Sequence, residues 1–93
     1  MQSSNLRSNL GIQVEILKAI RNEIQAKPSH ILQRANLSHA NLTRYLDRLV
    51  SSELISLNEI GGKRTYALTD NGVTFLKEMV QKEEFLSGFG LSL

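Results

Sequence analysis

Apolar residues return at helical spacing in the first third of the chain. For the most part they lie three or four positions apart, at Ile12, Ile16, Leu17, Ile20 and Ile24. This periodicity predicts an amphipathic helix that begins near Asn9, with Asn9 or Asn5 as the candidate cap. Pro28 disfavours helical backbone in the residue before it, so the helix is expected to end near Ala26.

A second, shorter helix is predicted over residues 29–34, with Ser29 as a candidate N-cap. The next three residues, 35–37, are too few for a strand and lie between two helical patterns. They are expected to form a tight turn between helices, in which Leu37 points inward. Asn36 is the residue expected to adopt the left-handed conformation that such a turn often needs.

Ser38 is the expected cap of a third helix, and Leu54 closes this helical segment. Three leucines at helical spacing mark its buried side, namely Leu42, Leu46 and Leu49. Tyr45 and Val50 flank this stripe. The ring of Tyr45 is therefore expected to pack on the core, while its hydroxyl meets water or a phosphate.

The pattern changes after the third helix, because Ile55 and Leu57 alternate with polar residues. Two short runs, residues 55–60 and 65–69, flank the sequence Gly-Gly-Lys-Arg at 61–64. Runs on either side of a Gly-Gly pair predict a β-hairpin. The two basic residues of this loop are expected to put positive charge at the hairpin tip.

A last helix is predicted from Thr69 or Asp70, one of which is its cap. Its apolar stripe comprises Val73, Leu76, Met79, Val80 and Phe85. Gly88 and Gly90 are expected to end the helix. Part of the stripe must cover the core of so small a domain, and the rest is a candidate dimer seam. The alternative is a purely intramolecular helix.

The order helix, helix, turn, helix, hairpin, helix is that of a winged helix-turn-helix, an α+β and mainly α fold. We therefore divide the chain into a flexible N-terminal tail at 1–8, a winged helix domain with its C-terminal helix at 9–86, and an apolar tail at 87–93. A chain of 93 residues is expected to form one such domain.

Composition narrows the classes of function. The chain has no cysteine, which excludes a disulfide framework and a thiolate metal site, and its two histidines are too few for a metal cluster. No apolar run is long enough to cross a membrane, and the Ser/Asn-rich start lacks the apolar core of a secretory signal. No nucleophile arrangement, nucleotide loop or small-molecule site is recognisable. We therefore expect neither an enzyme nor a cofactor or ligand, and we expect a cytoplasmic, nucleoid-associated protein.

Charge is unevenly distributed, although the net charge is only +2. Residues 27–66 hold six basic and three acidic residues, a balance of +3, whereas residues 67–93 hold two basic and four acidic residues, a balance of −2. A basic middle and an acidic end favour nucleic-acid binding on one side of a small domain.

Two stretches have a distinctive sequence: RANLSHANLTRYLDRLVSSELI at 34–55 and GGKRTYALTDNGVTFL at 61–76. They resemble an archaeal family of small winged helix-turn-helix proteins, which includes dimeric transcriptional regulators and chromatin-associated proteins. The resemblance implies binding to double-stranded DNA as a dimer, with the last helix as the dimer element. The helical pattern after Asp70 lasts only about four turns, so the long antiparallel coiled coil of that family is not expected. The apolar tail from Phe85 is the alternative dimer contact.

The exposed side of the third helix is the candidate DNA-reading surface, because the N-terminal end of this helix enters the major groove in a helix-turn-helix. Arginine donates twice to guanine and asparagine pairs with adenine, and Arg44 is the first candidate for a base contact. The wing and the second helix are expected to contact phosphates or, for the wing, the minor groove. The candidate DNA contacts are Ser29, Arg34, Ser38, His39, Asn41, Thr43, Arg44, Arg48, Lys63 and Arg64. Asp47 is expected to neighbour Arg44 or Arg48 and not to contact DNA.

The sequence leaves two functions open. The first is homodimeric binding of double-stranded DNA, as a transcriptional regulator or an architectural protein, with an affinity that falls with salt. The second is a winged-helix adaptor that binds protein and not DNA, which the apolar tail and the modest net charge favour. Under the second, the candidate DNA-reading surface is a solvated helix face and the basic loop only keeps a hairpin turn soluble. Dispersal of Arg44, Arg48, Lys63 and Arg64 over different faces would favour the adaptor.

Overall fold

The first helix opens the fold in this computed structural model, which describes residues 8–93. α1 (Asn9–Arg21) is capped by Ser8, whose Oγ accepts a hydrogen bond from a backbone N–H of the first turn at 2.8 Å. The predicted cap at Asn9 is therefore wrong by one residue, and Ser8 belongs to the domain and not to the tail. Asn5, the other predicted cap, and the rest of the predicted tail lie outside the described residues.

The end of α1 also differs from the prediction, because the helix stops at Arg21 and not near Ala26. Ala26 instead exchanges two backbone hydrogen bonds with Tyr66, at 2.8 and 2.9 Å, in an antiparallel bridge. Such a bridge requires extended backbone, which is incompatible with a continuing helix. Ile24, predicted to lie on the apolar stripe, falls in this non-helical segment and is 90% exposed.

The helix-turn-helix consists of α2 (Pro28–Ala35) and α3 (His39–Ser51). Pro28 occupies the first turn of α2, where its fixed φ suits the helix and its missing N–H is not needed. Ser29 consequently lies inside the helix, and the prediction that it is the N-cap is wrong. In the turn, Asn36 has φ 56° and ψ 56°, which confirms the predicted left-handed conformation.

Both ends of α3 are set by local backbone geometry. The predicted cap is confirmed, because Ser38 Oγ accepts a hydrogen bond from the Asn41 N–H at 3.3 Å. The helix ends before Leu54, earlier than predicted. Glu53 adopts a left-handed φ of 63°, and the Leu54 N–H then donates to the Leu49 carbonyl at 3.1 Å, an arrangement that terminates helices.

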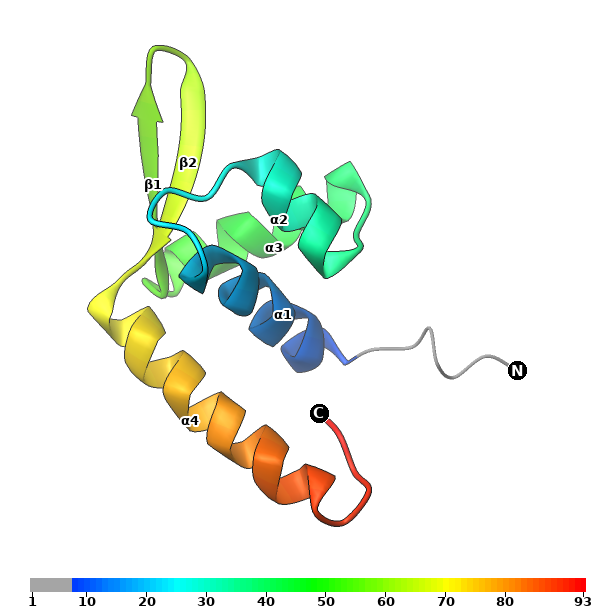
Figure 1. The fold of residues 1–93 in the computed structure, drawn as a ribbon. Helices are drawn as coiled ribbons and strands as arrows, with labels where there is room; N and C mark the ends of the chain where they lie inside the picture. Colours follow the sequence, from blue (N-terminus) through cyan, green and yellow to red (C-terminus); the bar gives the residue numbers. More distant parts are fainter. Residues whose placement is uncertain (1–7) are drawn as a thin grey trace.

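The wing is an antiparallel hairpin of β1 (Ile55–Ile60) and β2 (Lys63–Leu68) that projects away from the helices (Figure 1). Gly61 and Gly62 connect the strands with φ of 58° and 78°. Two successive positive φ angles match the right-handed twist of the strands, and glycine adopts them without strain. β2 begins two residues before its predicted start. Both basic residues predicted at the tip therefore lie in the first part of the strand, next to the turn.

α4 (Asp70–Ser87) starts directly after the wing and is about 27 Å long. The predicted cap at Thr69 is confirmed, since its Oγ1 accepts a hydrogen bond from the Gly72 N–H at 3.0 Å. The same hydroxyl donates to the Glu53 carbonyl at 2.6 Å, which fastens the helix to the end of α3. Gly72 is buried so close to the Leu54 carbonyl oxygen that a Cβ at this position would overlap it.

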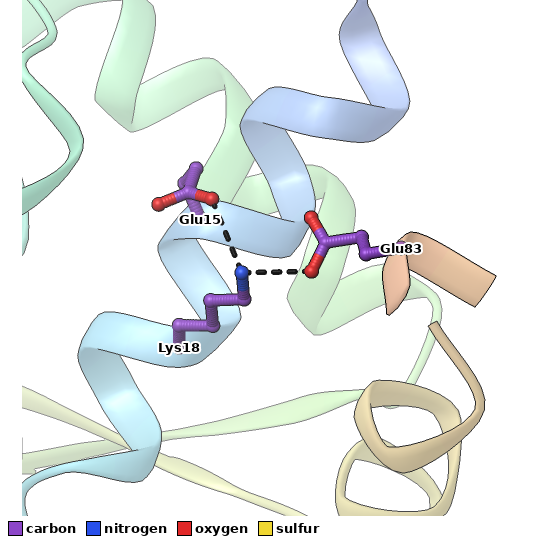
Figure 2. Close-up of polar contacts among 3 residues, drawn as sticks. All are labelled: Glu15, Lys18 and Glu83. Carbon is purple, nitrogen blue, oxygen red and sulfur yellow. Dashed lines mark hydrogen bonds and ion pairs between the residues drawn. The ribbon is translucent and has the colours of Figure 1, made fainter. Parts of the chain in front are cut away.

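An ion pair joins α4 to α1. Lys18 Nζ lies 2.8 Å from Glu83 Oε1 and 3.4 Å from Glu15 Oε2, so one ammonium contacts carboxylates of both helices (Figure 2). The hydrogen bond to Glu83 is the main cause that raises the pKa of Lys18 above its ordinary value. After α4 the chain turns back toward the start of α1 (Figure 1), and Leu93 packs against the core.

The core lies between α1, the helix-turn-helix, the base of the wing and the first half of α4. Its fully buried large side chains are Val14, Ile16, Leu17, Ile20, Ile31, Leu42, Leu49, Ile55 and Leu76. The α+β, mainly helical winged helix-turn-helix fold predicted from the sequence is confirmed. Among the residues the structure describes, no helix has both the length and the apolar character needed to cross a membrane.

Candidate nucleic-acid interface

α3 presents a polar face to solvent because its opposite face is anchored in the core. Leu42, Leu46 and Leu49 are at most 4% exposed, as predicted, and they fix the rotation of the helix about its axis. The residues left on the solvent side are exposed: His39, Ala40, Asn41, Thr43, Arg44, Asp47 and Arg48. The five candidate DNA contacts on α3 all lie on this exposed side, so the core packing directs them to solvent in the single chain.

Hydrogen bonds within α3 order part of this face. Arg44 Nη2 donates to Asn41 Oδ1 at 2.6 Å, so the two side chains best suited to base recognition form a linked pair. Thr43 Oγ1 donates to the His39 carbonyl at 3.1 Å, which leaves the hydroxyl oxygen as an acceptor. Asp47 neighbours Arg48 along α3, as predicted, but it makes no ion pair within residues 8–93.

Tyr45 links α3 to the start of α1. Its half-buried ring packs against the core, as predicted, and its hydroxyl donates to Asn9 Oδ1 at 2.8 Å. The hydroxyl was expected to meet water or a phosphate, and the structure shows that it donates to Asn9 instead. Asn9, Tyr45, Arg44 and Arg48 together line a small polar notch of about 50 Å³.

The wing carries two exposed cations beside its turn. Arg64 Nε lies 3.4 Å from Glu59 Oε2, its partner across the hairpin, and this hydrogen bond raises the pKa of Arg64 above its ordinary value. Lys63 has no ion-pair partner within the described part of the chain. The base of the wing is held by the Ala26 bridge and by a hydrogen bond of 2.6 Å from Thr65 Oγ1 to Gln25 Oε1. The wing is therefore oriented by the segment that precedes α2.

The candidates on α2 do not gather into one site. Ser29 is exposed in the first turn, next to His30, whose Nδ1 lies 3.1 Å from both carboxylate oxygens of Glu23. The Glu23 carboxylate thus contacts His30 and places a negative charge near the first turn of α2, where a phosphate contact was expected. Arg34 lines a depression with residues of α1, among them Lys18, and not the notch beside α3.

The outer side of α4 differs in character from the α3 face. Of the stripe predicted as a dimer seam, Leu76 and Met79 are 2% and 7% exposed in the single chain, so they are core residues and are not free to contact a partner. Val73 and Phe85 are exposed, and Val80 is half-buried. An apolar cavity of about 270 Å³ lies beside them, lined by Arg21, Leu68, Val73, Leu76, Lys77, Val80 and Gln81.

Sequence reasoning missed Asn9 as a member of the interface and treated Tyr45 mainly as a core residue. One local signal was present, since Asn41, Arg44, Tyr45 and Arg48 follow the spacing of one helix stripe. The contact to Asn9 spans 36 positions in the chain, and no local pattern encodes it.

The chain resembles known proteins both in its sequence pattern and in its fold. A family model described as winged helix-turn-helix matches residues 6–87. No curated protein matches the chain.

Solved structures with the same fold are only distantly similar in sequence. BpsR of Bordetella bronchiseptica, whose DNA binding is regulated by 6-hydroxynicotinic acid, is 20% identical, with a TM-score of 0.78 over 95% of this chain and 63% of BpsR. The DNA-binding protein Sso10a-2 from Sulfolobus solfataricus is 21% identical, with a TM-score of 0.73 over 90% of each chain. The oxidised form of MarR from E. coli is 24% identical, with a TM-score of 0.67 over 73% of this chain and 50% of MarR. These likenesses support the fold, and the chain spans only about half to two-thirds of BpsR and MarR.

Proposed function

Because the chain belongs to the winged helix-turn-helix family, we propose that it binds double-stranded DNA as a homodimer and acts as a transcriptional regulator. In this proposal α3 enters the major groove, and the wing lies on the backbone or in the minor groove. One observation carries the proposal. The anchored helix α3 holds Arg44 and Arg48 on its exposed face, and neither has a carboxylate partner within residues 8–93.

The charges of this face suit DNA better than they suit the protein alone. Arginine is always charged at neutral pH, and its planar fork matches phosphate oxygens or the guanine edge. Two guanidinium groups side by side repel each other unless an anion lies between them. Lys63 adds a third unpaired cation on the wing. The description of Sso10a-2 as a DNA-binding protein supports the same reading.

Fewer residues of α4 are available for the dimer contact than the sequence pattern suggested. With Leu76 and Met79 in the core, the remaining candidates on α4 are Val73, Val80 and Phe85. A stable interface buries roughly 1,200–2,000 Å² in total. We propose that the apolar C-terminal segment, with Phe89 and Leu91 exposed, contributes to it beside α4. We expect light scattering to give twice the chain mass of 10.4 kDa for the wild type. The variant Phe85→Ser is expected to shift the measured mass toward that of one chain.

The test of DNA binding is fluorescence anisotropy with a labelled duplex of about 30 base pairs, long enough for two half-sites one helical turn apart. Binding is measured at two salt concentrations for the wild type and for the triple variant Arg44→Ala/Lys63→Ala/Arg64→Ala. The control is Lys77→Ala/Lys82→Ala, which removes exposed positive charge from α4. We expect salt-sensitive binding that the triple variant loses and the control retains. Equal loss in both variants would show unspecific charge attraction and would contradict the proposed surface.

The adaptor remains the second candidate, because one observation favours it. Phe85, Phe89 and Leu91 are 59–69% exposed at the far end of α4, and the rings of Phe85 and Phe89 stack edge to face at 5.3 Å. Exposed aromatic clusters often mark protein interfaces. Absence of duplex binding by a folded wild-type protein, at low salt and over many sequences, would favour this function.

The archaeal origin and the absence of a small-molecule ligand stay predictions. BpsR is a related fold whose DNA binding responds to a small molecule.

A further inference from the structure

The polar notch between α1 and α3 has no function within the single chain that accounts for its charges. It is lined by Asn9 at the start of α1 and by Arg44, Tyr45 and Arg48 of α3. Neither arginine forms an ion pair with any described residue. A contact that served only to fasten α1 to α3 would need the Tyr45–Asn9 hydrogen bond and not the two cations.

The hydrogen bonds within the notch leave several of its N–H donors without a partner among the described residues. Asn9 Oδ1 accepts from the Tyr45 hydroxyl at 2.8 Å, so the Asn9 amide nitrogen, which can donate twice, is left for another partner. Arg44 gives one donor to Asn41 Oδ1 at 2.6 Å and keeps the others. Arg48 keeps all of its donors, since no hydrogen bond of its side chain is present among residues 8–93. The notch therefore offers many N–H donors and an excess of positive charge.

We propose that this notch is the seat of one backbone phosphate of the DNA, in which Arg48 and Asn9 hold the phosphate oxygens and Arg44 lies at the rim. This inference rests on the proposed function and names a contact that α3 does not make alone. A phosphate suits the notch better than a base edge does, because its oxygens accept from several donors at once and guanidinium groups bind them in a fork. Half to two-thirds of protein–DNA hydrogen bonds go to the backbone, and these contacts set the register of the protein on the duplex.

The phosphate seat makes α1 part of the DNA-binding surface. Figure 1 shows the start of α1 far from the tip of the wing, with α2 and α3 between them. A phosphate at the start of α1 and a contact at the wing would hold α3 from two separated points. Two such points fix the angle of α3 in the groove better than either alone. Tyr45 is then a positioning residue, because it orients the Asn9 amide and does not itself need to touch DNA.

The decisive variant is Asn9→Asp. A carboxylate at this position still accepts from the Tyr45 hydroxyl, and it suits the first turn of a helix, where negative charge is favourable. The new carboxylate would, however, form ion pairs with Arg44 and Arg48 in place of the phosphate. We expect the affinity for the duplex to fall roughly 10- to 100-fold. The slope of log K against log salt should become shallower by about one, which corresponds to the loss of one phosphate contact. The matched control is Asn71→Asp, the same change in an exposed residue of the first turn of α4.

Three further variants show whether the residues act on one phosphate. Arg48→Ala is expected to reduce the salt slope by about one unit as well. If Arg48 and Asn9 share a phosphate, the double variant Asn9→Asp/Arg48→Ala will bind little worse than the weaker single variant, because the contact is already lost. Tyr45→Phe keeps the ring and removes the hydroxyl, so a loss of about two- to five-fold is expected.

The outcomes separate this inference from the proposed function. If the wild type does not bind duplex DNA, the proposed function itself fails. If the wild type binds and Asn9→Asp matches Asn71→Asp in affinity and slope, DNA binding stands and the phosphate seat is overturned. A lower melting temperature of Asn9→Asp with an unchanged slope would overturn it as well, since that result assigns the notch to stability alone.

Discussion

Lys18 and Arg48 are both cations beside a contact of α1 with another helix, but their surroundings are opposite. Lys18 lies between Glu83 of α4 and Glu15 of its own helix, at 2.8 and 3.4 Å. Arg48 lines the notch at the start of α1 together with Arg44, and neither arginine has an ion-pair partner among the described residues. The α1–α4 contact is neutralised from within the chain, whereas the arginines of the α1–α3 notch have no carboxylate partner within residues 8–93. Under the proposed function, the first contact stabilises the fold and the second binds a phosphate.

The same contrast holds for the apolar residues of these two sides. On α3 the leucine stripe is buried, and apart from Ala40 the exposed residues are polar. On α4 the stripe is divided, with Leu76 and Met79 in the core and Val73 and Phe85 exposed. A polar face with unpaired cations favours nucleic acid, and an apolar face favours another protein surface. The proposed function accordingly assigns DNA to α3 and a second subunit to α4.

The largest effect on stability is expected at Gly72, where the start of α4 packs against the Leu54 carbonyl between α3 and the wing. Gly72→Ala would place a methyl group onto the Leu54 carbonyl oxygen, so α4 or the base of the wing must move. We expect a loss of roughly 2–4 kcal/mol in the free energy of unfolding, measured with denaturant. Gly88→Ala is the control, because its Cβ would lie at an ordinary 3.4 Å from the nearest atom and its φ of −61° suits any residue. Equal stability of the two variants would contradict the close packing at Gly72.

The next effect concerns binding and not stability. Arg44→Ala/Arg48→Ala is expected to weaken duplex binding by about 100-fold or more while the free energy of unfolding stays within about 0.5 kcal/mol. The reason is that neither guanidinium group has a carboxylate partner within residues 8–93, and Arg44 makes only an exposed hydrogen bond to Asn41 of its own helix. Anisotropy and denaturant unfolding on the same samples separate the two quantities. A large loss of stability would show that the arginines hold the fold.

A smaller effect is expected at Lys18, and it concerns stability and not DNA binding. Lys18→Met keeps the aliphatic stem and removes the charge, so the free energy of unfolding should fall by no more than about 1 kcal/mol, as for partly exposed ion pairs. Duplex affinity should stay within about twofold, since this contact lies between α1 and α4. Glu83→Gln is the matched change on the other helix. A marked loss of DNA binding in either variant would mean that the orientation of α4 controls the α3 face.

The smallest effect is a dependence on alkaline pH. The carboxylates around Lys18, Glu83 first, raise its pKa in the folded state above the ordinary 10.5. The stabilisation by the ion pair is therefore complete below 10.5 and disappears as pH rises through the folded-state pKa. The difference in unfolding free energy between wild type and Lys18→Met should therefore shrink as the pH rises above 10.5. A difference that grows over this range would contradict the ion pair.

The parts of the fold that local chemistry determines were predictable from the sequence. Ser38 and Thr69 cap helices because their hydroxyls lie next to free N–H groups, and Asn36 tolerates the left-handed turn. The leucine stripe of α3 follows from its period alone.

The errors lie where distant segments meet. The predicted end of the first helix failed because Ala26 pairs with Tyr66 of the wing, and Ile24 lost its expected place in the core. The Asn9–Tyr45 and Lys18–Glu83 contacts likewise join segments far apart in the chain. A periodic pattern in one segment carries no information about such partners, so the exposed face of α3 was predictable and the α1 side of the notch was not.

The most direct test of the whole account is a backbone amide NMR titration of the protein with a duplex of about 20 base pairs, which spans about two helical turns. The account predicts that the largest shifts fall in the first half of α3, at Lys63 and Arg64, and at Asn9, while the amides from Val73 to Phe85 change little. Shifts confined to α4 and the C-terminal segment, with α3 and Asn9 unmoved, would contradict DNA binding through the α3 face.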